Sequence, residues 1–400
     1  MSTAPIDAPL PGAAFGENAL YAAVQRSDRT AIEGLLAAGA DINKRTEWWA
    51  GGFGVLDECA PELAPFLMAR GAKLDAHAAA RLGMVRERRR LLHRDRSRVH
   101  ARGGDGQTPL HFASTMAIAK VLLSYGADID ARDIDHESTP AQYMLRVEHR
   151  RHYPRDRQDV ARFLVAYGCH TDLLMAAALG DAALVARHLD ADPACIAMSV
   201  SETWFPKRDP RAGGTIYIWQ LGRHRTAHTV ARDFGHEDVF ALLMSRTPAG
   251  LKLALACELG DETTFRAFLA QQPVIGPELA HKLPDAAQSN NLAAVRLLLE
   301  AGWPVDAPGE MGATALHWAG FNGNAAMARA ILAHRPALER KSREYPGTPL
   351  SWAIFGSGNG WRRDNTDYAS VVAALLAAGA QMPDNASALD PSPAVRELLG

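Results

Sequence analysis

Short apolar segments that end close to a glycine recur along the chain. An apolar pair stands three or four residues before a glycine in five places: Leu35-Leu36, Leu122-Leu123, Phe163-Leu164, Leu298-Leu299 and Leu375-Leu376. Glycine readily adopts the left-handed conformation in which many helices end. Each segment therefore predicts a helix that packs its apolar side on a neighbour. Around residue 120, Val121 and Leu122 face that neighbour and Gly126 ends the helix.

A second block, rich in alanine, precedes several of these segments. Thr108–Ala113 returns as Thr314–Ala319 and Thr348–Ala353, with weaker copies at Thr139 and Thr226. Proline is favoured at the first position of a helix, where its missing N–H has no partner to lose. Small alanine side chains allow close approach of helices. The block thus predicts a first helix, which is followed by the glycine-terminated second helix.

The spacing of these blocks fixes their period. Gly39 and Gly71 are 32 residues apart, Thr108 and Thr139 are 31 apart, and Thr314 and Thr348 are 34 apart. A unit of about 33 residues with a turn and two antiparallel helices resembles the ankyrin repeat. The resemblance implies an all-α solenoid of about eleven units. It also implies a protein that binds other proteins.

The repeat pattern divides the chain into three parts. We expect a flexible N-terminal segment at residues 1–16, an ankyrin repeat array at 17–384 and a C-terminal capping helix at 385–400. A single unit leaves one face unburied, so stability comes from stacking on neighbours. The pattern is degenerate over residues 172–308, where the unit boundaries are least regular.

Three insertions interrupt the period, near residues 145–158, 199–225 and 355–368. The first and third fall between the two helices of a unit, and the second falls between units. Residues 215–219 are β-branched and aromatic, which predicts a strand. With residues 196–200 as its partner, this strand predicts a β-hairpin finger with a long turn that overhangs the concave face. Inserted loops of this kind often carry function.

Composition indicates a folded intracellular protein. Hydrophobic residues make up 48% of the chain and charged residues 22%, and the formal net charge is −2. Four cysteines lie far apart with no CxxC pair, which excludes a disulfide framework and suits a reducing compartment. Residues 1–15 lack the features of a signal peptide, and no apolar run approaches a membrane span. We expect a cytoplasmic, bacterial-type monomer with no membrane contact.

Positive charge is concentrated in two segments. Residues 81–102 hold nine arginines against Glu87 and Asp95, and residues 146–157 hold five against two acids. An alternative function is therefore binding of nucleic acid or an acidic partner through these two segments, with Arg86, Arg88, Arg89 and Arg90 as the nucleic-acid contacts. Residues 81–102 include no aromatic residue on which a base could stack, which favours a solvated helix surface there. Comparison with Val185 of a parallel repeat predicts that Arg88 faces the core, with Val85 in that role as the alternative.

Candidate catalytic and metal-binding residues have simpler structural interpretations. In the repeat that this chain resembles, the histidine at the positions of His111 and His317 bridges adjacent turns. His149 and His152 flank a Pro-Arg loop with no pair of carboxylates nearby. Residues 356–360 are glycine-rich but follow no predicted strand. No nucleophile elbow or zinc-protease motif occurs. We expect a protein that is not an enzyme and needs no metal or cofactor.

Aromatic and arginine side chains in the insertions form the candidate binding site. Trp and Arg are enriched at the hot spots of protein interfaces. The predicted partner-binding residues are Trp204, Phe205, Arg208, Arg211, Trp219, Trp361 and Arg362. Packing of the finger on its own scaffold is the alternative, and Trp318 and Trp352 also suit a stacked core. A small-molecule site under the finger, formed by Asp209, Arg223, His224 and His228, is a further alternative and allows catalysis.

Overall fold

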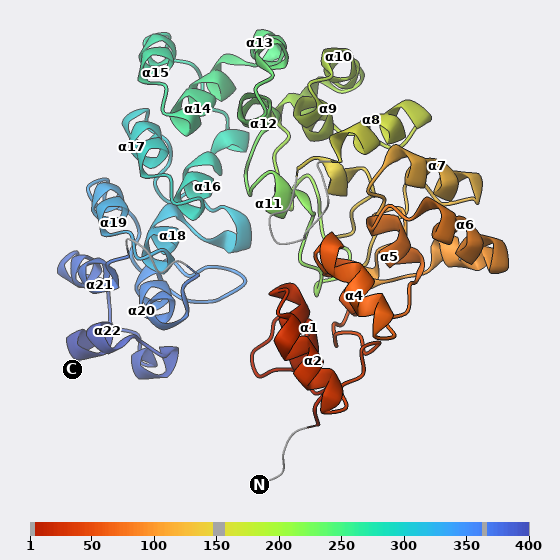
Figure 1. Cartoon of the computed structure of the whole chain (residues 1–400). Helices are drawn as coiled ribbons and strands as arrows, with labels where there is room; N and C mark the ends of the chain where they lie inside the picture. Colours follow the sequence, from red (N-terminus) through yellow and green to blue (C-terminus); the bar gives the residue numbers. More distant parts are fainter. Residues whose placement is uncertain (1–4, 147–156, 362–365, 400) are drawn as a thin grey trace. The chain divides into compact units, whose positions relative to one another are not determined.

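The computed structural model describes residues 5–146, 157–361 and 366–399 (Figure 1). The chain divides into two compact units, Met1–Val239 (unit 1) and Phe240–Gly400 (unit 2). Most of the predicted insertion at 145–158 and part of that at 355–368 lie outside the described residues. Arg362, His149 and His152 are among them.

Unit 1 is built of short α-helices joined by turns and 3₁₀ segments. Its helices are α1 (Ala19–Gln25), α2 (Arg29–Ala37), α3 (Val55–Glu58), α4 (Ala64–Ala69), α5 (Ala76–Arg81), α6 (Val85–Arg94), α7 (Met116–Ser124), α8 (Gln158–Tyr167), α9 (Leu173–Leu179), α10 (Ala182–Ala191), α11 (Tyr217–Gln220) and α12 (Ala227–Asp233). Pairs such as α1 with α2 and α9 with α10 pack together, and α12 packs on α9. The helix α13 (Glu237–Arg246) spans the boundary between the units.

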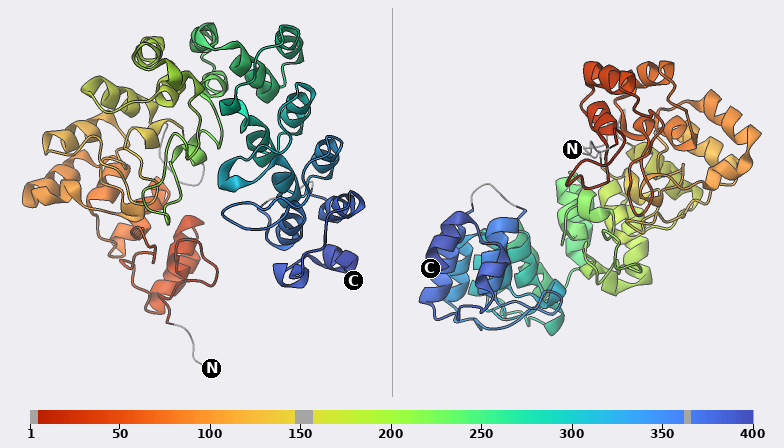
Figure 2. Two further views of the ribbon diagram at one scale, coloured as in Figure 1. Left: turned by 180° about the vertical axis from the view of Figure 1, so that it is seen from behind. Right: turned by 90° about the horizontal axis from the view of Figure 1, so that it is seen from below.

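Unit 2 shows the helix pairs most regularly. Its helices are α14 (Ala249–Leu259), α15 (Glu262–Leu269), α16 (Lys282–Gln288), α17 (Leu292–Glu300), α18 (Ala315–Phe321), α19 (Ala325–Leu332), α20 (Pro349–Asn359), α21 (Tyr368–Ala377) and α22 (Pro393–Leu399). The first helices α16, α18 and α20 stack in one row. The second helices α17, α19 and α21 form a parallel row, which can be followed in the left view of Figure 2.

The helix ends follow the sequence signals closely. Gly126 has φ +91°, and the N–H of Ala127 donates to the carbonyl of Leu122 at 3.0 Å, which confirms the predicted left-handed end of α7. Thr348 caps α20, and Pro349 is the first residue of that helix. The earlier Thr108-Pro109 pair opens a single turn instead. Thr115 already caps α7, so this unit has too few residues for a longer first helix.

Two buried histidines join the start of their repeat to the next turn. In both His111 and His317, Nδ1 accepts from the N–H of the preceding threonine at 3.1 Å. Their Nε2 atoms contact the carbonyls of Ser138 and Gly347 at 3.1 Å. The ring must therefore be neutral with its proton on Nε2. These bonds confirm the structural role predicted for both histidines.

The turns that precede first helices, called inter-unit turns below, are linked by backbone hydrogen bonds. In unit 1 the N–H of Asp105 donates to Gly51 at 3.1 Å, and that of Ile134 donates to Asp105 at 2.9 Å. In unit 2 the N–H of Arg343 donates to Met311 at 2.8 Å. Each turn thus satisfies backbone groups of the next one. We call this series of bonds the turn ladder.

Two arginines of the positively charged segment are buried. Arg88 and Arg81 both have 0% exposure, which confirms the core-facing position predicted for Arg88. One Arg88 nitrogen donates to the Ala76 carbonyl, whereas Nε and the second terminal nitrogen have no partner within the described residues. Burial lowers the pKa of Arg88 to about 9, because a charge is costly away from water. Arg88 therefore opposes the stability of unit 1.

Acid should destabilise the chain through the two histidines. Burial lowers the pKa of His111 to about 3 and that of His317 to about 4, while the unfolded value is 6.5. Below pH 6.5 the unfolded chain binds protons that the folded chain does not, so stability falls as pH falls. Each histidine should lower the free energy of unfolding by about 2 kcal/mol when the pH falls from 7 to 5. Urea unfolding of the His111→Gln, His317→Gln variant should show a shallower pH slope. An unchanged slope would refute this assignment.

Replacing Arg88 by methionine should stabilise unit 1. The change removes a buried, incompletely hydrogen-bonded charge and keeps most of the side-chain volume. The expected gain in the free energy of unfolding is about 1–3 kcal/mol, measured by urea denaturation. Arg89→Met, at an exposed position of the same helix, serves as the control and should stay within about 0.5 kcal/mol. A loss of stability in Arg88→Met alone would contradict the interpretation.

Candidate functional site

The 199–225 insertion is not a β-hairpin. Its base is closed by one bridge between Ser199 and Thr226, and the N–H of Val200 donates to Arg225 at 2.9 Å. The prediction of a strand over residues 215–219 is wrong, because Tyr217–Gln220 forms the helix α11. Tyr217 and Gln220 point to one side, where they bond Asp172 at 2.9 Å and the Tyr143 carbonyl at 2.7 Å. A spacing of three residues on one face requires a helix.

Residues 209–215 take the place of a missing inter-unit turn. Only Cys169, His170 and Thr171 separate Gly168, which caps the end of α8, from Asp172, which caps the start of α9. This connection is too short to form a turn of its own. The N–H of Gly213 donates to the carbonyl of Asp135 at 2.9 Å, which extends the turn ladder. The inserted segment therefore completes the array.

The carboxylate of Glu137 holds the middle of the insertion. It accepts from the backbone N–H groups of Arg208 and Asp209, both at 2.9 Å. Nearby, Nδ1 of His136 contacts the Gly214 carbonyl at 2.9 Å, and the Ile216 N–H donates to Ser138 at 3.0 Å. The insertion packs on the turn at residues 133–138, as the alternative interpretation of the sequence expected.

The predicted binding residues are placed in several different environments. Phe205 packs edge-on against Tyr217 at 5.3 Å, and Trp204 beside it is half-buried. Arg211 pairs with Asp209 at 2.7 Å and lies over the ring of Trp49 at 4.4 Å. Trp219 is 64% exposed and lines neither the cavity in unit 1 nor the cleft in unit 2 that are described below. These residues do not form one cluster.

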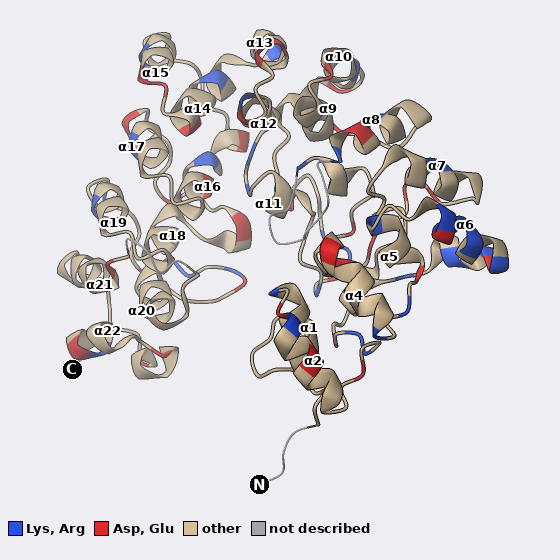
Figure 3. Ribbon diagram, in the orientation of Figure 1, with Lys and Arg blue, Asp and Glu red and all other residues tan. Residues whose placement is uncertain are grey.

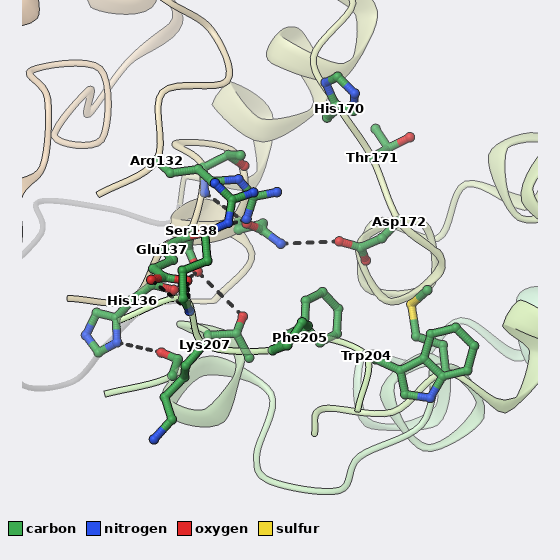
Figure 4. Close-up of a pocket in the computed structure, with 17 residues that line it drawn as sticks. Arg132, His136, Glu137, Ser138, His170, Thr171, Asp172, Trp204, Phe205 and Lys207 are labelled. Atoms are coloured by element: carbon green, nitrogen blue, oxygen red, sulfur yellow. Dashed lines mark hydrogen bonds between the residues drawn. The ribbon is translucent and has the colours of Figure 1, made fainter. Parts of the chain in front are cut away.

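A cavity of about 320 Å³ lies between the 199–225 insertion and the preceding repeats of unit 1 (Figure 4). We call it the unit 1 cavity. Trp204 and Phe205 form one wall, the loop from Arg132 to Thr139 forms another, and His170–Asp172 borders a third side. Lys207 and Arg208 also line it. Sequence analysis had found Trp204, Phe205 and Arg208 but none of the residues on the opposite walls.

Thr139 differs from its counterparts in other units. The hydroxyls of Thr108 and Thr314 contact the Nδ1 of the histidine three residues later, at 2.9 and 2.8 Å. In the Thr139 unit, Gln142 replaces that histidine, and its Oε1 accepts from the Thr139 N–H at 2.9 Å. The Thr139 hydroxyl is left without a hydrogen-bond partner among the described residues, although Thr139 is only 4% exposed.

Unit 2 contains an apolar cleft of about 480 Å³, called the unit 2 cleft. Aromatic rings dominate its lining: Trp318, Phe321, Tyr345, Trp352, Phe355 and Trp361. Trp318 meets Trp352 edge-on at 5.1 Å, and Phe321 meets Trp361 at 4.9 Å. The spacings Trp318-Phe321 and Trp352-Phe355 place each pair on one helix face, a signal in the sequence that was missed.

Part of this aromatic cluster is core and part is surface. Trp318 and Trp352 are 2% and 8% exposed, whereas Trp361 is 73% exposed and Phe355 is 44% exposed. The buried Nε1 of Trp318 has no hydrogen-bond acceptor in the part of the chain that the structure describes. By contrast, Nε1 of Trp352 donates to the Tyr345 carbonyl at 3.3 Å. The cleft thus has a buried aromatic floor with an unused donor and a rim of exposed rings.

The arginine-rich segment at residues 81–102 exposes only some of the arginines that were predicted to contact a partner. Figure 3 shows Lys and Arg concentrated on α6. Arg86, Arg89 and Arg90 are exposed there, but the buried Arg88 cannot contact a partner. This corrects the predicted set. Most of the second segment, 146–157, lies outside the described residues, and Arg157 is buried against the carbonyls of His111 and Tyr143.

The other predicted small-molecule residues do not line the unit 1 cavity. His224 and His228 are buried at 7% and 0% exposure, and Asp209 is occupied by Arg211. Among the described residues, no group of three His, Cys, Asp or Glu side chains is arranged to hold a metal ion. Burial raises the pKa of each cysteine thiol, to about 11 for Cys59 and Cys195 and about 12 for Cys169 and Cys257.

The stacked helix pairs, the turn ladder and the bridging histidines define a helical repeat protein. Sequence comparison specifies the family: residues 105–134 match the ankyrin repeat and residues 283–385 match the model for three copies of it. The chain is an ankyrin repeat protein, and its fold is an all-α ankyrin-repeat solenoid. The repeats support a role in protein–protein interaction.

A similar segment occurs in the palmitoyltransferase Hip14 of Drosophila melanogaster. The two chains are 31% identical over 124 residues, which cover 30% of this chain and 18% of Hip14. The similarity thus spans less than a fifth of that enzyme's length. Within the described residues, no helix is long and apolar enough to cross a membrane.

Glu137→Ala should release the inserted segment. Charge-assisted bonds to two backbone N–H groups would be lost, each worth about 1.5–3 kcal/mol. Trypsin should then cut after Lys207, Arg208 or Arg211 at least about tenfold faster under native conditions. Glu202→Ala is the control, because its ion pair with Lys207 is solvent-exposed and contributes little. Equal cleavage of both variants would show that Glu137 does not hold the segment.

Proposed function

We propose that this protein is a non-catalytic scaffold that binds a protein partner and takes an apolar side chain of that partner into the unit 2 cleft. The supporting observation is a rigid aromatic floor with partly exposed rings at its rim. Monomeric proteins rarely expose such a patch without using it. The proposal retains the predicted concave surface and, among the inserted loops, the one that carries Trp361, which anchors the partner in this cleft.

The chemistry of the lining selects the occupant. None of the described residues that line the cleft carries a charge. A charged group would lose its hydration there without gaining a partner, so the occupant must be apolar. Aromatic rings that pack edge-to-face offer a large contact area at little cost in side-chain entropy. Both features are typical of the pockets that receive hot-spot residues of a partner.

The unpaired Nε1–H of Trp318 further restricts which chemical groups suit the cleft. An unpaired buried N–H costs about 1–3 kcal/mol, and an acceptor on the occupant would recover that cost. A peptide segment supplies both an apolar side chain and adjacent carbonyl oxygens. We therefore infer that the occupant is a peptide segment with one large apolar residue, whose backbone carbonyl accepts from Trp318.

We place the protein in the cytoplasm. The four cysteines are free and buried, at positions 59, 169, 195 and 257. Free thiols are typical of reducing compartments. This part of the proposal is independent of the cleft.

Selection of peptides from a random display library on the full chain tests the proposed site. The enriched peptides should share one large apolar residue. Phe355→Ala and Trp361→Ala should each weaken their binding about tenfold or more, as expected for hot-spot positions. Both side chains are substantially exposed, so folding should persist.

Trp219→Ala is the matched control, because it removes an equally exposed tryptophan from unit 1. Binding to this variant should be unchanged. If Trp219→Ala weakened binding as much as Trp361→Ala, or if the enriched peptides lacked an apolar anchor, the cleft would not be the binding site.

A further inference from the structure

We propose that the unit 1 cavity binds a small anionic molecule, one that carries a phosphate or carboxylate group on a flat apolar body. Its volume of about 320 Å³ lies at the lower end of the range for small-molecule pockets. Three segments distant in sequence enclose it, and their contacts hold the walls in place. This site is independent of the protein-binding cleft in unit 2.

Two guanidinium groups line the cavity without a carboxylate partner in the described part of the chain. Arg132 donates to the Glu137 carbonyl at 2.7 Å, which leaves its charge uncompensated. Arg208 is held through its backbone N–H, so its side chain is free to meet a ligand. Arginine presents several donors in a planar fork that matches phosphate and carboxylate groups.

The two carboxylates of the cavity are already committed to donors of the protein. Glu137 accepts from the N–H groups of Arg208 and Asp209. Asp172 accepts from the Met175 N–H at 2.8 Å, the Tyr217 hydroxyl at 2.9 Å and Gln142 at 3.3 Å. A cationic ligand would therefore have to displace structural hydrogen bonds, whereas an anionic ligand would meet unused donors.

The Thr139 hydroxyl is the second, independent observation. It is buried at the cavity lining and has no hydrogen-bond partner, because Gln142 stands where other units have a histidine. Leaving such a group unpaired is costly unless something else satisfies it. A ligand oxygen that accepts from Thr139 accounts for this departure from the repeat.

The wall opposite these donors selects the body of the ligand. Trp204 and Phe205 are both half-buried and lie side by side on this wall (Figure 4). Phe205 is fixed by its edge-on contact with Tyr217. Flat apolar groups pack well against such rings, with centroids about 4.5–7 Å apart. An aryl phosphate or aryl carboxylate combines this body with the required anion.

Calorimetry and thermal unfolding of the full chain with defined probes test the proposal. The probes are phenyl phosphate and benzoate, with inorganic phosphate, benzyl alcohol and benzylamine for comparison. Phenyl phosphate or benzoate should bind and raise the melting temperature by about 2 °C or more at high occupancy. Comparison of the two shows which anion is preferred. Benzyl alcohol and benzylamine should bind at least about tenfold more weakly.

Two variants locate the binding in the cavity. Arg208→Glu should weaken anion binding at least about tenfold, whereas Arg89→Glu, on the exposed face of α6, should not. Thr139→Val removes only the unpartnered hydroxyl, so it should leave the melting temperature of the free protein unchanged or higher. It should nevertheless weaken anion binding several-fold.

Three results would overturn the proposal. Equal binding of benzylamine and phenyl phosphate would show that the cavity does not select an anion. Undiminished binding by both Arg208→Glu and Thr139→Val would place the anion elsewhere. Absence of binding by every anionic probe would show that the cavity does not take this class of ligand.

Discussion

The turn ladder is the constraint on which the rest of unit 1 depends. Buried backbone N–H and carbonyl groups must be paired, and in a repeat array the next turn supplies the partner. The bonds Asp105 to Gly51 and Ile134 to Asp105 continue in this way until the short connection after Gly168. Without a further turn, the groups around Asp135 would be exposed. The 199–225 insertion meets this requirement through Gly213, so its first role is structural.

Both candidate binding sites occur where the repeat is modified. The 199–225 insertion comes from a more distant part of the chain, and together with the 132–139 loop it encloses the unit 1 cavity. In unit 2 the first helices α18 and α20 each carry a tryptophan and a phenylalanine on one face, and α20 extends to Asn359, so rings accumulate around Trp352. Regular repeats bury their surfaces on each other, whereas these modified repeats leave hydrogen-bond donors and aromatic rings that a ligand can contact.

Local signals in the sequence predicted the elements well and their long-range contacts poorly. The period, the end of α7 at Gly126, the bridging histidines and the buried Arg88 all follow from nearest-neighbour stacking of similar units. The strand expected at 215–219 was wrong because Tyr217 and Gln220 bond to Asp172 and to the Tyr143 carbonyl, which are far away in sequence. The unit 1 cavity has the same origin: Thr139 becomes unpartnered only through Gln142, and Glu137 is engaged only by the returning insertion.

Native-state hydrogen exchange of the Gly213 amide tests most directly whether the insertion is part of the array. The N–H of Gly213 and that of Ile134 each donate to the neighbouring inter-unit turn at 2.9 Å. If residues 209–215 complete the turn ladder, the two amides should be protected to a similar degree, since they open together with the array. Exchange of Gly213 at the rate of an open loop, with Ile134 still protected, would show that the insertion is a free arm and contradict this account.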